Sequence, residues 1–75
     1  MIRQAYLQFH DHEDRWYVQW RNQSYPLSCG TSLALRMAGR YVPCRLELSH
    51  DWYIITAEKR FVLHPKEVYD VKADL

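Results

Sequence analysis

Tyr41-Val42-Pro43-Cys44-Arg45-Leu46-Glu47-Leu48 is the stretch that decides the fold. Every second side chain in it, beginning with Val42, is small or apolar, which is the period of a strand that is buried on one face. Pro43 has no N–H to donate to a neighbouring strand, so this strand is expected at an edge of the sheet or bulged at that residue. The stretch therefore predicts a β domain.

The segments around this strand have the same character. Residues 5–9, 16–20 and 33–37 alternate in the same way, 52–56 is rich in β-branched and aromatic side chains, and polar or glycine-containing turns at 10–14, 38–39 and 49–51 separate these runs. Phe61–Leu63 is a further short strand. After Pro65 we expect one helical turn at Lys66–Val68 and a last extended piece at Tyr69–Val71. The first two runs are predicted to be antiparallel neighbours.

Together these patterns predict an all-β fold. We expect a single small domain over residues 1–75, built as an antiparallel five- to six-stranded barrel or a strongly bent sheet, SH3-like, with at most one short helical turn. Trp16 and Trp20 lie at inward positions of their strand and are expected in the core. Cys44 should be a packed thiol, whereas Cys29, beside Gly30, should be the more exposed one.

Composition limits the function classes. Ten Lys and Arg residues against nine Asp and Glu residues leave a net charge of +1, so total charge does not favour binding to nucleic acid or a membrane. Any electrostatic function has to come from local clustering. Two cysteines are too few for a disulfide scaffold, and no segment has the ~20 apolar residues of a membrane span. We expect a cytoplasmic protein with two free thiols and no membrane contact.

From Leu27 onward the order of residues is more specific than their composition. Cys29-Gly30 is followed by Gly39, Tyr41, Pro43, Arg45 and Glu47 at fixed spacing, and then by Asp51-Trp52-Tyr53. Over residues 27–56 the chain resembles an uncharacterised family of small proteins from Gram-positive bacteria and their mobile elements. The resemblance implies a compact β domain and implies no activity.

No motif for catalysis or metal binding is present. His10, His12, Glu13 and Asp14 cluster in one turn, but a His-x-His pair in a hairpin loop supplies two nitrogens where a zinc site needs four ligands. Neither cysteine has the Cys-x-x-Cys spacing of a metal site, and 75 residues leave little room for a cleft that excludes water. We expect no enzyme activity, no cofactor and no metal.

One surface remains as a candidate for binding. It combines the residue types that anchor interfaces, Arg, Tyr and Trp, in seven residues: Arg36, Arg40, Tyr41, Arg45, Glu47, Trp52 and Tyr53. A plain solvated ion pair between Arg45 and Glu47, or with a cross-strand partner, is the structural alternative. We expect a non-catalytic protein-binding module, or a small inhibitor or accessory protein encoded by a mobile element and acting on a host protein complex. The alternative is a small nucleic-acid-binding β-barrel.

Overall fold

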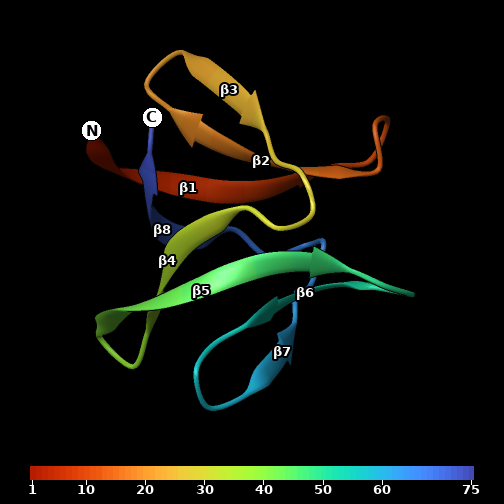
Figure 1. The fold of residues 1–75 in the computed structure, drawn as a ribbon. Coiled ribbons are helices and arrows are strands. Elements are labelled where there is room, and N and C mark those ends of the chain that lie inside the picture. The colour runs from red at the N-terminus through yellow and green to blue at the C-terminus, as the bar shows by residue number, and fades with distance from the viewer.

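The computed structural model describes all 75 residues. They form one antiparallel sheet of eight strands, joined by turns and loops, and no helix (Figure 1). The strands are β1 (Ile2–His10), β2 (Arg15–Trp20), β3 (Gln23–Pro26), β4 (Ser32–Met37), β5 (Arg40–Leu48), β6 (Trp52–Ile55), β7 (Arg60–Val62) and β8 (Tyr69–Asp74). Their order across the sheet is β3-β2-β1-β8-β4-β5-β6-β7.

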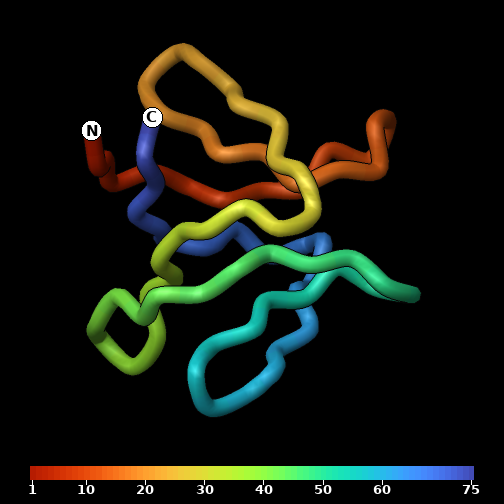
Figure 2. The backbone as a smooth tube through the Cα atoms, in the orientation of Figure 1, coloured from red at the N-terminus to blue at the C-terminus, as the bar shows by residue number.

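The last strand of the chain lies in the middle of the sheet. β1, β2 and β3 form one antiparallel meander, and β4 to β7 form a second one. β8 pairs with β1 from Ile2–Asp74 to Leu7–Tyr69 and with β4 at Ala34–Lys72 and Leu35–Val71. Figure 2 shows the blue C-terminal segment passing between the red and the yellow-green parts of the chain. The two meanders are therefore joined through β8.

The structure confirms the all-β antiparallel prediction and changes its details. The sheet has eight strands where five or six were expected, and it stays open, with β3 and β7 at its edges, instead of closing into a barrel. β3 was missed because its sequence, Gln23–Pro26, is short and not apolar at alternate positions. The expected helical turn at Lys66–Val68 is absent. The chain instead makes a turn at Pro65–Lys66, in which the Glu67 N–H donates to the His64 carbonyl oxygen with an N···O distance of 2.9 Å.

Pro43 lies at a position of β5 where no neighbouring strand requires a backbone N–H. Both backbone groups of Leu46 bond toward the β4 side, to Gly30 N and Thr31 O, so by alternation the backbone of Pro43 is directed to the opposite side. β6 pairs with β5 only from Arg45 to Leu48. At Pro43 the strand is therefore a local edge, as predicted, although β5 is interior over its second half.

The core fills the concave side of the bent sheet. It comprises 13 buried residues, Ala5, Leu7, Trp16, Val18, Leu27, Leu33, Leu35, Cys44, Leu46, Ile54, Leu63, Val71 and Ala73. Trp16 is completely buried, and its ring lies 5.4 Å from Phe9 and 5.9 Å from Tyr69, measured between ring centroids. Trp16 is therefore placed as expected, whereas Trp20 is half-buried and lies at the margin of the core, packed against this cluster.

A tight turn sets the register between β4 and β5. Ala38 and Gly39 have φ angles of 51° and 81°, and Met37 pairs with Arg40 across the turn. Two consecutive positive φ angles are typical of the two-residue hairpin turns whose twist matches that of paired strands. The register puts Arg36 directly opposite Tyr41, with both side chains on the convex face.

We expect β8 to carry a large share of the stability. Val71 is fully buried, so Val71→Ala should lower the free energy of unfolding by about 2 kcal/mol through lost burial and the cavity it leaves. The measurement is urea denaturation followed by tryptophan fluorescence. Val68→Ala, at a side chain that is 58% exposed, is the matched control and should change stability by less than about 0.5 kcal/mol. Equal effects of the two substitutions would contradict a central role for β8.

Candidate functional site

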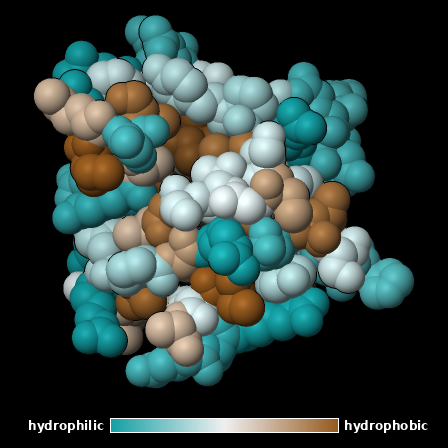
Figure 3. Space-filling model, viewed as in Figure 1, coloured by the Kyte–Doolittle hydropathy of each residue, from teal (hydrophilic) through white to brown (hydrophobic).

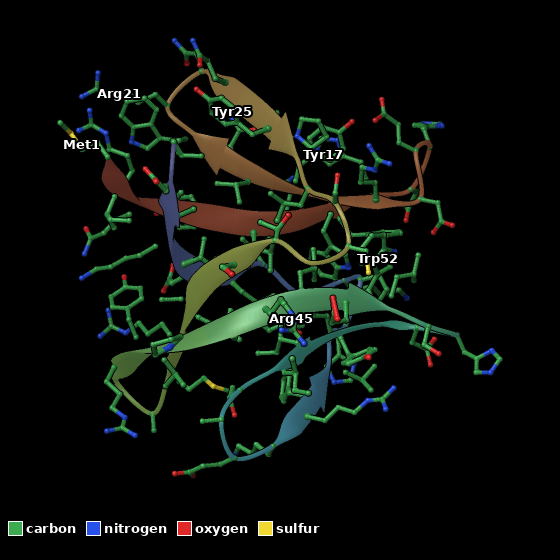
Figure 4. The ribbon with its side chains drawn as sticks, viewed as in Figure 1. Met1, Tyr17, Arg21, Tyr25, Arg45 and Trp52 are labelled. Atoms are coloured by element: carbon green, nitrogen blue, oxygen red, sulfur yellow. The ribbon has the colours of Figure 1, made fainter.

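The candidate site lies on the convex, outer face of the sheet. Strand alternation places Arg36, Tyr41, Arg45, Glu47 and Tyr53 on this face, because their neighbours in sequence point into the core. In Figure 4 the Arg45 side chain stands in front of β5. Five of the seven predicted surface residues are thus brought to one face of the sheet, and Arg40 lies at its rim, beside the β4–β5 turn.

Trp52 is not part of this face. It is opposite Leu48 in the β5–β6 ladder, whereas Tyr53 is opposite Glu47, so the two aromatic side chains of β6 leave the sheet on opposite sides. Trp52 is half-buried and packs against the core. Expecting it on the surface with Tyr53 was wrong, because adjacent residues of a strand cannot share a face.

The lower part of the face is the Tyr53 cluster: Arg45 and Glu47 of β5, Tyr53 and Ile55 of β6, and Arg60 and Val62 of β7. Their cross-strand pairs are Glu47–Tyr53, Arg45–Ile55, Tyr53–Val62 and Ile55–Arg60. The guanidinium carbon of Arg60 lies 3.8 Å from the centroid of the Tyr53 ring. Ile55 is 36% and Val62 46% exposed. Figure 3 shows hydrophobic atoms at the surface over β6 and β7, bordered by hydrophilic ones.

Arg45 and Glu47 form an ion pair along β5 and not across strands. The Arg45 Nε lies 3.4 Å from Glu47 Oε2, and the Arg45 side chain is 53% exposed. Exposed pairs of this kind contribute about 0–1 kcal/mol. Glu47 also accepts a weak hydrogen bond from the Cys29 thiol, 3.5 Å from its Oε1, which places the loop between β3 and β4 beside this carboxylate.

The upper part of the face is the Tyr41 cluster: Arg36 of β4, Tyr41 of β5 and Lys72 of β8. The Lys72 Nζ lies 4.5 Å and the Arg36 guanidinium carbon 5.8 Å from the centroid of the Tyr41 ring. Beside it is a hollow of about 330 Å³ lined by Gln4, Ala5, Tyr6, Arg36, Tyr41 and Asp70. Tyr41 and Arg45 are four residues apart on one strand, about 13 Å, so the predicted surface divides into two clusters.

Basic and acidic residues lie at opposite ends of the sheet, a separation that the net charge of +1 does not show. One end of the sheet, where β1, β3, β5 and β7 begin, holds seven of the ten basic residues: Arg3, Arg21, Arg36, Arg40, Lys59, Arg60 and Lys72. It holds only two of the nine acidic ones, Glu58 and Asp74, an excess of five positive charges. We call it the basic end. Figure 4 shows Met1 and Arg21 there and Trp52 at the opposite end.

The opposite end is acidic and carries all four histidines. Its turns hold Asp11, Glu13, Asp14, Asp51 and Glu67, together with His10, His12, His50 and His64. No group of three or more His, Cys, Asp or Glu side chains is arranged to hold a metal ion. The chain also forms no helix long and apolar enough to cross a membrane.

The two thiols differ as the sequence predicted. Cys29 is exposed and Cys44 is buried. Burial raises the pKa of the Cys44 thiol above its ordinary value of 9.0, and a hydrogen bond with the backbone of Leu35 offsets only part of that rise. Because the thiolate is the reactive form, Cys44 is protected both by burial and by protonation.

We therefore expect biphasic thiol labelling. At pH 8 Cys29 should react with an aromatic disulfide reagent at least about 100-fold faster than Cys44, which needs local opening of the core to react. Stopped-flow absorbance measures both phases, and Cys29→Ser should leave only the slow one. Equal rates for the two thiols in the folded protein would contradict this placement.

Arg45 should matter little for stability. Arg45→Ala removes a half-exposed ion pair, so the free energy of unfolding should fall by less than about 1 kcal/mol in urea denaturation. Ser32→Ala, on the strand position opposite Arg45, is a control for the loss of a polar outer side chain. A loss of 2 kcal/mol or more would show that Arg45 has a structural role that the exposed geometry does not explain.

Comparison with known proteins identifies the family of this chain through one family model. No curated protein and no solved structure matches the chain. One family model matches residues 5–73, a span that reaches from β1 to β8 and includes both clusters of the outer face. The match confirms the expectation that the chain belongs to an uncharacterised domain family. The chain belongs to the family described as a domain of unknown function, DUF5348.

Proposed function

We propose that this chain is a non-catalytic protein-binding module that contacts its partner through the Tyr53 cluster. The observation that carries the proposal is the exposure of Ile55 and Val62 directly beside the Arg60–Tyr53 pair. A solvated sheet face alternates apolar inward residues with polar outward ones. Here two of the four outward positions of β6 and β7, Ile55 and Val62, are apolar and exposed, which is a pattern typical of a surface that another molecule covers.

The residue types of the cluster suit a protein partner. Tyr and Arg are enriched among the side chains that contribute most to binding, and such side chains are surrounded by contacts that exclude water. Stacking on Tyr53 holds the Arg60 guanidinium in place, so less side-chain entropy is lost when it pairs with a carboxylate of the partner. Arg45 provides a second cation on the other side of Tyr53, with Glu47 as its present partner.

The partner is inferred to carry apolar side chains flanked by a carboxylate. A standard interface buries roughly 800 Å² on each protein, about a seventh of the 5338 Å² surface of this domain, so most of the outer face around Tyr53 would be covered. Binding without catalysis fits an accessory or inhibitory protein that occupies a surface of a host complex. We place this action in the cytoplasm and associate it with the mobile-element origin that the sequence pattern suggests.

The test compares recovery of a partner by matched variants. Tagged full-length protein, its Ile55→Asp variant and its Val68→Asp variant are expressed in the native host, crosslinked and purified. Val68 is the control because it is 58% exposed but lies outside the cluster, before β8. Wild type and Val68→Asp should recover the same protein, and Ile55→Asp should not. Thermal unfolding confirms that all three are folded.

The recovered protein is then purified and titrated. Ile55→Asp and Tyr53→Ala should each weaken binding by about 30-fold, corresponding to about 2 kcal/mol, whereas raising the salt concentration should change affinity little. Recovery of the same proteins by all variants, or equal affinities in titration, would refute the Tyr53 cluster as the binding surface.

A further inference from the structure

We propose that a second site, the hollow beside Tyr41, binds a base of single-stranded nucleic acid, and that the cations of the basic end bind the adjoining phosphates. The site is separate from the Tyr53 cluster and does not depend on the function proposed for it. Three observations support it: two tyrosines at one hollow, polar groups there without partners, and cations concentrated around them.

The hollow has the size and the aromatic groups that a base requires. Its volume of about 330 Å³ lies at the lower end of the range for small-molecule sites. Tyr6 comes from β1 and Tyr41 from β5, and β8 and β4 lie between these strands, so the two side chains border the hollow from opposite sides. Tyr6 is 55% exposed although it is in a central strand. An exposed tyrosine on a sheet is a stacking surface of the kind that single-strand-binding domains use.

The polar groups of the hollow have no partners within the protein. The side-chain hydrogen bonds and ion pairs of the domain involve neither Gln4 nor Asp70, and they do not involve the hydroxyl groups of Tyr6 and Tyr41. An amide and a carboxylate are the groups that read the edges of bases through hydrogen bonds. Asp70 repels phosphate, so it suits the base and not the backbone of a bound strand.

The cations give the strand its orientation. The Arg36 guanidinium carbon and the Lys72 Nζ, from β4 and β8, lie 5.8 Å and 4.5 Å from the centroid of the Tyr41 ring. Arg40 follows at the β4–β5 turn. Arg3 and Arg21 are at the same end of the sheet but stack on Trp20, on the core side, so they add to the positive field there and do not line the hollow. The phosphates of a bound strand are thus attracted toward the basic end, while its base lies in the hollow beside Asp70.

This arrangement excludes a duplex and predicts a base preference. Bases that are paired and stacked in a duplex cannot enter a hollow on a sheet, whereas an unstacked base can. The Asp70 carboxylate is an acceptor only, so it favours bases that present an amino group, such as cytosine and adenine, over thymine and uracil. An acidic peptide would satisfy the cations but would be repelled by Asp70 and show no such preference.

The experiment is fluorescence anisotropy of labelled 12-nucleotide DNA strands with the purified full-length protein. Oligo-dC should bind about tenfold more tightly than oligo-dT, and a duplex of the same length should bind more weakly than either. With about three phosphate contacts, from Arg36, Lys72 and Arg40, log affinity should fall against log salt with a slope of about −2. Similar binding of dC, dT and duplex, or binding of poly-glutamate that competes equally, would overturn the proposal.

Variants assign the site. Tyr41→Ala should weaken oligo-dC binding by about tenfold, Arg36→Ala should reduce the salt slope by about 0.7, and Asp70→Ala should remove the preference for dC over dT. Arg36 is exposed and makes no side-chain hydrogen bond, so its substitution tests the site without risk to folding. Arg15→Ala removes an equal charge from the acidic end and should leave both affinity and slope unchanged. Equal effects of Arg36→Ala and Arg15→Ala would refute the site.

The two proposals can fail separately. Ile55→Asp disrupts the Tyr53 cluster and should not change oligonucleotide binding at constant salt, whereas Tyr41→Ala should not change recovery of a protein partner. If Ile55→Asp abolished oligonucleotide binding in a protein that remains folded, the hollow would not be the nucleic-acid site.

Discussion

The antiparallel pairing of β8 with both β1 and β4 is the interaction on which the rest of the structure depends. Six residue pairs join β8 to β1, and two join it to β4. Without them the β1–β3 and β4–β7 meanders would each expose an unpaired edge and an uncovered apolar face. With them, Val71 and Ala73 complete the core, and the ends of the chain meet, where Leu75 N–H donates to the Met1 carbonyl oxygen.

The same pairing assembles the outer face. Lys72 reaches the Tyr41 ring, and Asp70 joins Tyr6 at one hollow, although these partners are far apart in the sequence. A site built on the middle strands of a sheet is held by ladders on both sides, so its geometry is more rigid than that of a loop. Both clusters of the face share β5, and this strand therefore carries a cation, an aromatic ring and an acid at fixed spacing.

Segregation of charge follows from antiparallel topology. Successive connections between strands lie at alternate ends of the sheet. Basic residues predominate in or beside the connections after β2, β4 and β6, and acidic ones in or beside those after β1, β5 and β7, so the two kinds of charge accumulate at opposite ends. A domain with almost no net charge then presents one end with an excess of five positive charges and one acidic end. The field at a surface depends on this distribution and not on the total.

Local sequence determined the all-β class, the exposure of Cys29, the burial of Cys44 and Trp16, and the local edge at Pro43, because each depends on the period of two along a strand or on the chemistry of one residue. The same period was enough to place Arg36, Tyr41, Arg45, Glu47 and Tyr53 on one face, and applied to Trp52 it would have placed that ring in the core. Only the tertiary structure decided the position of β8, the open edges, the clustering of cations and the hollow between Tyr6 and Tyr41. These depend on which strands become neighbours, and pairing between segments distant in the sequence is selected by burial of the whole core and not by any local pattern.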